Sequence, residues 1–349
     1  MDKIKNVKSF DEAKQKNKAL VNKGNLPDYA SPITNALLKN KLFSIKNVDY
    51  NFSLIKKDIN IYSRGEYLFS KVAVENEGSD FKIYDNILIK IATLMPLDMR
   101  AFSLLVWLLE KLQRENSNKV EFHINEVFDF LGYQPKNRKS KDKNEVSNRM
   151  LALSYILLQV FSKQLSGKIK TAEDFYEYEG IKTSSLFSIF NIEYDAECGV
   201  FRVVCSDNLY KIYSKSNWNM IDTNEYRKLN TSTEKAVFKY LTYRDYGHNQ
   251  KIGMKLDLFY EATGLSEYGK YEAKRKLKQA LERMRENGFI KSYYIDSQKL
   301  VNIDLITSKK RKVIEANNEK VSKEDKAKNE KPESIFEEQI DFIDSSEYL

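Results

Sequence analysis

The hydrophobic and polar positions of the chain follow one order of elements twice. In the second half, apolar residues recur first at helical spacing, then alternate briefly, and then return at helical spacing twice more. Two alternating segments close the series, joined by a short polar turn. We therefore predict a long helix, a short strand, a short helix, a basic helix and a hairpin. These elements are predicted over residues 231–247, 251–255, 256–263, 268–287, 289–294 and 300–306.

Local signals predict the ends of these helices and the face that the basic helix buries. Thr231, Ser232 and Thr233 offer hydroxyl N-caps, and Glu234 stands where a capping-box carboxylate would. Gly264 is predicted to end the short helix, because glycine adopts the left-handed conformation without strain. The cations of the basic helix fall mostly outside its apolar stripe, so its outer face is predicted to be cationic. That stripe is predicted to comprise Tyr271, Leu277, Ala280, Leu281 and Met284.

The first half follows the same order with a weaker pattern. Helical periodicity predicts two long helices, which Pro96 separates, and KVEFHI alternates as a strand. Asn125 is predicted to cap a short helix that Gly132 ends, and a basic loop then leads into a further helix. The last two strands could form the hairpin of this half or connect two domains. The predicted ranges are helices 81–94, 99–114, 126–131 and 144–161, basic loop 134–143, and strands 119–124, 186–194 and 200–205.

Helix, strand, helix, basic helix and hairpin is the order of a winged helix, in which a basic recognition helix enters the DNA major groove. We therefore predict an α+β chain with two tandem winged-helix domains, a disordered N-terminal arm and a disordered C-terminal tail. The second domain is expected to be the main DNA-binding domain, and the first to make a further contact with DNA. The predicted boundaries are 1–60 for the arm, 61–215 and 216–306 for the two domains, and 307–349 for the tail.

Composition and charge agree with two DNA-binding domains. A chain of 349 residues with 42% hydrophobic residues is long enough for two cores. The net charge is +8, but residues 306–349 hold nine Lys/Arg against eleven Asp/Glu. The part before them has 49 against 39, or +10, so the excess cation lies on the folded part, where it would neutralise phosphates. The charged, aromatic-free run 306–332 is predicted to be disordered.

The candidate DNA contacts follow from this organisation. In the second domain, the cations at the start of the basic helix are expected to face DNA. The same is expected of the cation in the turn of the closing hairpin, which is called the wing. The first domain is expected to make a weaker contact through its basic loop and the following helix, although a flexible basic loop is an equal alternative. The candidates are Lys136, Arg138, Lys139, Lys141, Asn144, Arg149, Lys270, Lys274, Arg275, Lys278 and Lys299, with Tyr268 and Tyr271 as further backbone contacts.

Catalytic sites find no support in the sequence, and no metal or cofactor is predicted. Residues 264–270 spell G-x-x-x-x-G-K, but Tyr271 follows where a phosphate-binding loop needs Ser or Thr, and the motif follows a helix instead of a strand. His123 and His248 are the only histidines and lie on separate predicted domains, which excludes a paired-histidine metal site for DNA nicking. His123 is interpreted as a plain sheet residue. With two cysteines, Cys198 and Cys205, read as core thiols, and no signal peptide or spanning run, a cytoplasmic protein is expected.

The order of segments resembles plasmid replication initiators of the TrfA/RepA type over roughly residues 60–305. The resemblance implies binding to repeated origin sites on double-stranded DNA, local melting of adjacent AT-rich DNA and recruitment of host replication proteins. It also implies a monomer–dimer equilibrium in which the first domain, residues 61–215, mediates dimerisation. The segments that carry it are 67–74, 81–85, 122–132 and a basic helix in the first half, and 226–229, 235–243, 256–264 and 272–290 in the second.

The C-terminal tail offers a candidate partner-binding peptide. Gln339, Ile340, Phe342 and Ile343 resemble the short peptides by which bacterial replication proteins bind the sliding clamp, and a disordered tether would let such a peptide search. A tail that packs on its own protein is the plain alternative. Host helicase or initiator are further expected partners. Two other functions remain open at this stage, which are a winged-helix transcriptional regulator and a nucleic-acid-processing enzyme with an unrecognised site.

Overall fold

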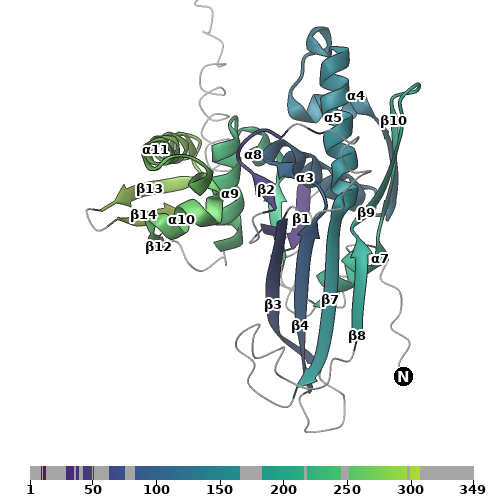
Figure 1. The fold of residues 1–349 in the computed structure, drawn as a ribbon, viewed down its shortest axis with the longest axis horizontal. Coiled ribbons are helices and arrows are strands. Elements are labelled where there is room, and N and C mark those ends of the chain that lie inside the picture. Colours follow the sequence, from purple (N-terminus) through teal and green to yellow (C-terminus); the bar gives the residue numbers. More distant parts are fainter. Residues whose placement is uncertain are drawn as a thin grey trace, which may run out of the picture.

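The computed structural model describes part of the chain, and its folded part mixes helices and strands (Figure 1). Two bodies of similar construction flank a long antiparallel sheet that extends away from them. We call the body of residues 99–152 and 190–205 the first unit, and that of residues 232–244, 251–296 and 299–305 the second unit. The described residues are 9, 11–12, 29–34, 37–38, 42–48, 50, 63–74, 83–165, 183–215, 218–244, 251–296 and 299–306.

The second unit confirms the predicted order of elements. Thr231 Oγ1 accepts the backbone N–H of Glu234 at 3.2 Å at the start of α9, and Gly264 ends α10 with φ of 76°. The strands form an antiparallel sheet in the order β12-β14-β13, with the hairpin on one side. Its elements are α9 Ser232–Arg244, β12 Lys251–Lys255, α10 Leu256–Thr263, η5 Leu265–Glu267, α11 Lys270–Glu286, β13 Ile290–Ile295 and β14 Leu300–Leu305.

The first unit has the same topology. Its sheet runs in the order β6-β10-β9, which matches the second unit strand for strand. The last hairpin therefore belongs to the first unit as its wing and does not connect two domains. Its elements are α3 Met99–Arg114, β6 Lys119–His123, α4 Ile124–Leu131, η3 Pro135–Asn137, α5 Ser140–Ala152, β9 Phe190–Asp195 and β10 Val200–Cys205.

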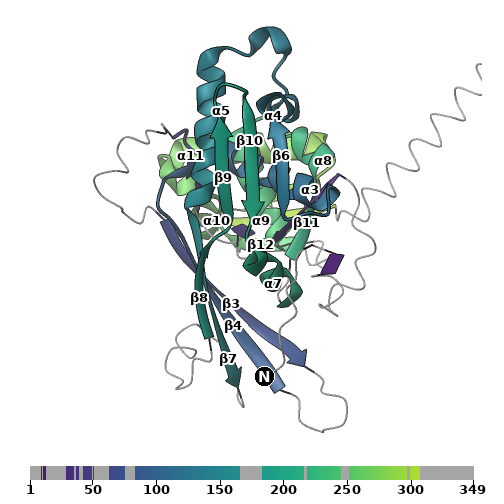
Figure 2. The ribbon, with the colours of Figure 1, turned by 90° about the vertical axis from the view of Figure 1, so that its right-hand side faces the viewer.

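One predicted helix is wrong and a second is confirmed only in its first part, because strands of a four-stranded sheet take the place of the rest. The helix predicted over 81–94 is strand β4 (Ile83–Thr93), and the helix predicted over 144–161 runs only from Ser140 to Ala152. After a 3-10 turn, η4 (Leu153–Tyr155), the chain continues as β7 (Ile156–Leu165). We call the antiparallel sheet of β3, β4, β7 and β8 the long sheet; Figures 1 and 2 show it extending from the two units. Strands β3 and β8 span Ser63–Val74 and Thr183–Ser188.

The short helix α4 (Ile124–Leu131) begins two residues earlier than predicted, and a histidine caps it. His123 Nδ1 accepts the backbone N–H of Asn125 at 3.1 Å, while Glu126 Oε1 accepts the backbone N–H of His123 at 3.2 Å. These two reciprocal bonds form a capping box. Asn125, the predicted cap, lies inside the helix, and Gly132 ends it as expected, with φ of 79°. His123 is therefore a helix cap at the end of β6 and more than a sheet residue.

Part of the predicted N-terminal arm lies in the core. Strand β1 (Ala30–Thr34) is fully buried and pairs antiparallel with β11 (Trp218–Asp222). Strand β2 (Phe43–Ser44) pairs parallel with β5 (Leu97–Asp98), just before α3. The sequence does not predict these contacts, because the apolar residues are scattered through a lysine-rich segment. The partner of each strand is also distant in sequence. The connection to the second unit runs through α7 (Asp207–Lys215), β11 and α8 (Thr223–Arg227).

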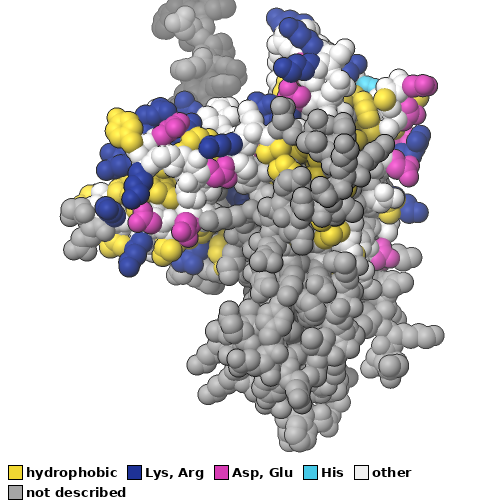
Figure 3. All heavy atoms as spheres, in the orientation of Figure 1, with side chains coloured by type: hydrophobic (Ala, Val, Ile, Leu, Met, Phe, Trp, Pro, Cys, Tyr) yellow, Lys and Arg dark blue, Asp and Glu magenta, His cyan; other side chains and the backbone are white. Residues whose placement is uncertain are grey.

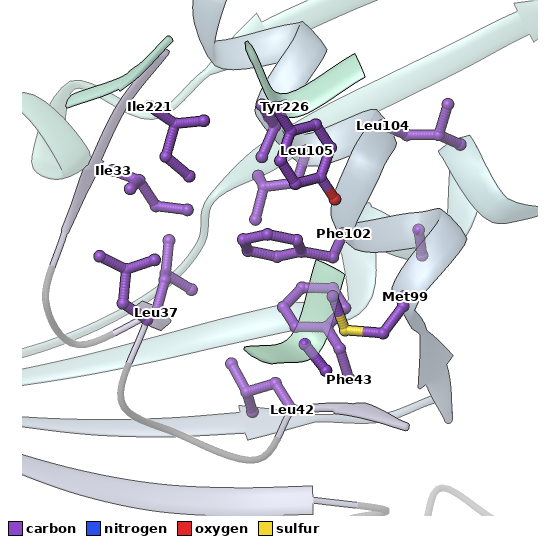
Figure 4. Packing of buried hydrophobic residues seen from close by; sticks show 14 of the residues in the cluster. Ile33, Leu37, Leu42, Phe43, Met99, Phe102, Leu104, Leu105, Ile221 and Tyr226 are labelled. Atoms are coloured by element: carbon purple, nitrogen blue, oxygen red, sulfur yellow. The ribbon is translucent and has the colours of Figure 1, made fainter. Parts of the chain in front are cut away.

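The core centres on α3, which buries 13 of its 16 residues. Figure 4 shows Phe102 of this helix surrounded by side chains from the N-terminal segment and from the segment after α7. The ring of Phe102 lies 5.1 Å from that of Phe43 and 6.1 Å from that of Tyr226, both edge-on. Such edge-to-face pairs add to the energy of burial. Cys205 is buried as predicted, whereas Cys198 is exposed in the wing turn of the first unit.

Helix α3 also carries the contact between the two units. Ser103 Oγ lies 3.0 Å from Tyr226 Oη and accepts a hydrogen bond from Lys235 Nζ of α9 at 3.2 Å. One turn further along α9, the ammonium of Lys239 lies 6.0 Å from the ring of Phe43 and 5.9 Å from that of Phe102. Burial lowers the pKa of Lys239 to about 7.

In the described part of the chain, no helix is long and apolar enough to cross a membrane.

Replacing Lys239 by Met should stabilise the protein most near neutral pH. The folded-state pKa lies below the ordinary value of 10.5, so the unfolded chain binds more protons between about pH 7 and 10.5. The wild-type free energy of unfolding should therefore rise across this window. Lys239→Met removes that dependence, so its advantage should shrink by an amount on the order of 2 kcal/mol between pH 7 and pH 9.5. Urea unfolding at both pH values measures it, with the exposed Lys278→Met as the control. An advantage independent of pH would contradict a buried neutral lysine.

Candidate nucleic-acid interface

The helix-turn-helix of the second unit consists of α10, the turn η5 and α11. Gly264 allows the sharp turn through its positive φ, and Leu265 in η5 is fully buried. The turn therefore packs into the core of the unit and fixes the direction in which α11 begins at Lys270. On α11 the buried residues are Ala273, Leu277, Ala280, Leu281 and Met284.

Four of the five predicted stripe residues are thus confirmed, and Tyr271 is the exception. Its side chain is 86% exposed, and Ala273 takes the buried position instead. The aromatic ring points away from the core, on the same side of the helix as the neighbouring cations. A tyrosine this exposed is available for contact with a ligand of the helix, as the sequence suggested for backbone contact.

The outer face of α11 is cationic at its N-terminal half. Lys270, Lys274 and Lys278 are all exposed and follow one another at a spacing of four residues, so they lie along one line of the helix. Within the described residues, no acidic side chain forms an ion pair with these three lysines. Arg275 beside them is exposed, donates to Gln279 Oε1 at 3.3 Å and lies 4.0 Å from Glu272 Oε1, which also pairs with Lys276 at 3.6 Å. Figure 3 shows Lys and Arg side chains gathered over this unit.

The C-terminal half of α11 has no such row of lysines without an acidic partner, and both of its arginines are paired. Arg283 binds the buried carboxylate of Glu234 at 2.9 Å, and Arg285 pairs with Glu282. The free cations of the helix therefore lie in its first two and a half turns, the half that a recognition helix inserts into the major groove. Lys299, at the wing turn, is exposed and has a left-handed backbone with φ of 61°.

The first unit presents a second group of exposed cations around the start of α5. Lys136, Lys139, Lys141 and Asn144 are all exposed, and Figure 3 shows Lys and Arg side chains at this end of the molecule in the same view as those of the second unit. Lys143 is exposed as well and belongs to the group, although only the surrounding basic loop and not this residue was singled out from the sequence. Lys139 and Lys141 line an open hollow between the end of α4 and the start of α5.

Two of the candidate arginines are held by the protein itself. Arg138 pairs with Asp129 and donates Nε and Nη2 to the carbonyl oxygen of Tyr133 at 3.2 and 3.0 Å. Its guanidinium also lies 5.5 Å from the ring of Phe128. The arginine therefore fastens the turn after α4, and this removes it from the group of free cations.

Arg149 is buried and cannot reach DNA. Its Nε donates to both carboxylate oxygens of Asp98, at 3.0 and 3.3 Å, and Nη1 contacts Glu145. Asp98 itself caps α3 by accepting the backbone N–H of Ala101 at 2.9 Å. The pair therefore joins α5 to the start of α3. Arg149 was assigned to the DNA surface because a charged residue on a basic helix is normally solvated, and its partner lies 51 positions away.

The described residues show no arrangement for catalysis by a bound metal. No group of three or more His, Cys, Asp or Glu side chains among them could hold an ion. The G-x-x-x-x-G-K segment forms the turn between α10 and α11 and follows a helix, which is not the geometry of a phosphate-binding loop. The clamp-like peptide Gln339, Ile340, Phe342 and Ile343 lies outside the described residues.

No family model matches the chain, and neither does any curated protein. Among solved structures it is similar to RctB domains 2–3, with 12% identity over 70% of this chain and 92% of the other at a TM-score of 0.40. A second structure of these domains gives 10% identity, coverages of 73% and 95%, and a TM-score of 0.43. The Pi initiator protein in complex with iteron DNA gives 9%, coverages of 60% and 91%, and 0.42.

Replacing Arg149 by Ala should destabilise the fold and not selectively weaken nucleic-acid binding. The change leaves the carboxylate of Asp98, which is 1% exposed, without its cation. Breaking a buried pair in this way typically costs about 3–5 kcal/mol. Thermal unfolding should show a large loss for Arg149→Ala and almost none for Lys143→Ala on the same helix. Equal thermal stability of the two variants would indicate that Arg149 lies at the surface and not in a buried ion pair.

Proposed function

We propose that the protein is a sequence-specific double-stranded DNA-binding protein that initiates replication at repeated origin sites. The observation that supports it best is the row of unpaired cations on the N-terminal half of α11, the recognition position of a winged helix. Lys274, Arg275 and Lys278 are the proposed main contacts, with Lys270 at the helix entry, Lys299 in the wing and the exposed Tyr271 beside them.

The second winged helix of the same chain favours an extended DNA site. Lys136, Lys139, Lys141, Lys143 and Asn144 lie at the start of α5, the element that corresponds to α11 in the first unit. Two recognition helices in one chain suit adjacent contacts along a repeated sequence better than a single short operator. The proposal assigns no catalytic step and no cofactor to the protein.

Three parts of the proposal are supported by the resemblance of the segment order to plasmid replication initiators. These are the role in replication, the local melting of DNA and the monomer–dimer equilibrium. The same resemblance supports the recruitment of host replication proteins, among them helicase or initiator.

The tail peptide around Gln339 and Phe342 is proposed to bind the sliding clamp. Titrating a peptide of residues 334–349 onto the clamp tests this, and equal binding of the Gln339→Ala/Phe342→Ala peptide would remove it.

Footprinting on the DNA that flanks the gene separates this function from its main alternative. Protection of several tandem repeats is the result expected of an initiator. Protection of one operator inside a promoter would instead identify a transcriptional regulator with the same folds. An absence of protection at any salt concentration would refute DNA binding through these units.

Alanine at Lys274, Arg275 and Lys278 together should weaken binding to the protected site and lower its salt dependence. Each lost phosphate contact reduces the slope of log affinity against log salt by about one unit, whereas a lost base contact relaxes specificity at one position. Titrations at several salt concentrations distinguish the two. Arg285→Ala is the matched control, because this residue lies at the other end of α11 and pairs with Glu282. A triple variant that binds like the parent would refute the assignment.

Alanine at Lys136, Lys139, Lys141 and Lys143 tests the first unit separately. If α5 occupies its own groove, the protected region should shorten by about one helical turn, or about 10 base pairs. An unchanged footprint with unchanged affinity would assign these lysines to a solvated surface.

A further inference from the structure

One short stretch of the N-terminal segment contacts both units, and it does so beside each recognition helix. We call residues 42–48 the strap. Its apolar side chains Leu42, Phe43 and Ile45 are 2%, 5% and 3% exposed and lie in the common core. Phe43 packs edge-on against Phe102 of α3, and the ammonium of Lys239 from α9 lies 6.0 Å from its ring. The strap therefore passes between the helix that centres the first unit and the first helix of the second unit.

On the side of the second unit, the strap contacts the turn that precedes α11. Ser44 Oγ donates a hydrogen bond of 2.6 Å to Glu267 Oε2, although 223 positions separate the two residues. Lys46 Nζ lies 5.4 Å from the ring of Tyr268. Two residues after Tyr268 the recognition helix begins. The strap thus contacts the residues that set the direction of α11.

On the side of the first unit, the strap leads into the buried pair that anchors α5. The backbone N–H of Val48 donates to Asp98 Oδ2 at 3.4 Å, and Tyr50 Oη accepts the backbone N–H of Asp98 at 3.1 Å. The guanidinium of Arg149, which comes from α5, lies 5.2 Å from the ring of Tyr50. The strap together with Tyr50 therefore reaches from the turn before α11 to Arg149 in the body of α5.

Two bodies that touch at one place can rock about that place, and a second attachment removes the motion. The first place is the contact of α3 with α8 and α9, around Ser103, Tyr226 and Lys235. The second is the strap, which reaches the far end of the second unit at its turn. We propose that the strap is a positioning element that fixes the offset between α5 and α11, with the hydrogen bond from Ser44 to Glu267 as its fastening point.

This inference rests on the proposed function only for its consequence on DNA. A fixed offset lets both helices meet their grooves without a further loss of orientational freedom, so the second contact forms at a high effective concentration. It also selects the spacing of the two contacts along the duplex. The strap, and not only the linker that joins the units, then determines which repeat spacing the protein accepts.

Distances between spin labels in the free, full-length protein test the strap without DNA. Labels on Asn144→Cys of α5 and Gln279→Cys of α11 sit on exposed positions, and Cys198→Ser removes the exposed native thiol, while Cys205 is buried. The unmodified strap should give one narrow distance distribution. Ser44→Asp places a carboxylate against that of Glu267, so we expect the narrow peak to be lost in favour of a broader or double distribution. A distribution as narrow as that of the parent overturns the proposal.

Rescue and control variants isolate the fastening point. Adding Glu267→Gln to Ser44→Asp restores a donor opposite the carboxylate and should restore the narrow peak; failure of this rescue also overturns the role of the pair. Ser266→Ala lies in the same turn, is exposed and should leave the distribution unchanged. Thermal unfolding of each variant verifies that the fold is intact, since Ser44 and Glu267 lie at the surface.

Binding to DNA provides the second readout. Duplexes recovered from a random-sequence pool by the parent protein serve as probes, in full length and truncated to the contact of the second unit. Ser44→Asp should lose about tenfold in affinity for the full duplex, or about 1.4 kcal/mol, and keep its affinity for the truncated one. Equal losses on both duplexes would contradict a role in positioning. If the pool yields no duplex, the proposed function fails, and the label distances still decide whether the strap holds the units.

Discussion

The burial of α3 is the constraint on which the rest of the structure depends. A helix with 13 of its 16 residues inside the protein needs apolar partners on every side, and one winged helix cannot supply them. The N-terminal strand, the strap, the segment after α7 and the first helix of the second unit therefore all pack around it. This shared burial makes the two units one structure, because the core of the first unit is completed by residues that belong to the second and to the N-terminal segment.

Burial also explains why the charged groups in the interior of this structure have different roles from those on its surface. Asp98 is withdrawn from water and satisfied by Arg149, by two backbone N–H groups and by the surrounding turn, so it organises the start of α3. Lys239 is withdrawn among aromatic rings and loses most of its preference for the charged form. The exposed lysines of α5 and of the first half of α11 lie in water and are available to phosphates. The sequence shows the same residue types in all three places.

The second unit could be predicted almost completely, because its signals are local. Gly264, Thr231 and the periodicity of α11 each act within a few residues, and the exposure of Lys274, Arg275 and Lys278 follows from helical spacing alone. The first unit could be predicted only in part. Strand β4 has β-branched residues at Ile83, Ile87, Ile89 and Ile91, an alternation typical of a strand, yet only pairing with the distant β3 and β7 decides against a helix. Tertiary partners at long range likewise determine the positions of Arg149 and of the strap, and no local pattern reveals them.

The pairing of β1 with β11 has a consequence for how the molecule forms. Ala30 lies opposite Asp222, so this sheet closes a loop of about 190 residues. At ordinary rates of synthesis the N-terminal strand emerges from the ribosome roughly 10–40 seconds before its partner does. During that interval β1 lacks the strand with which it pairs, and α3 lacks its contacts with α8 and α9. A nascent chain of this design therefore benefits from a chaperone that shields the strand until residue 222 arrives, while the locally specified second unit can fold as soon as it is complete.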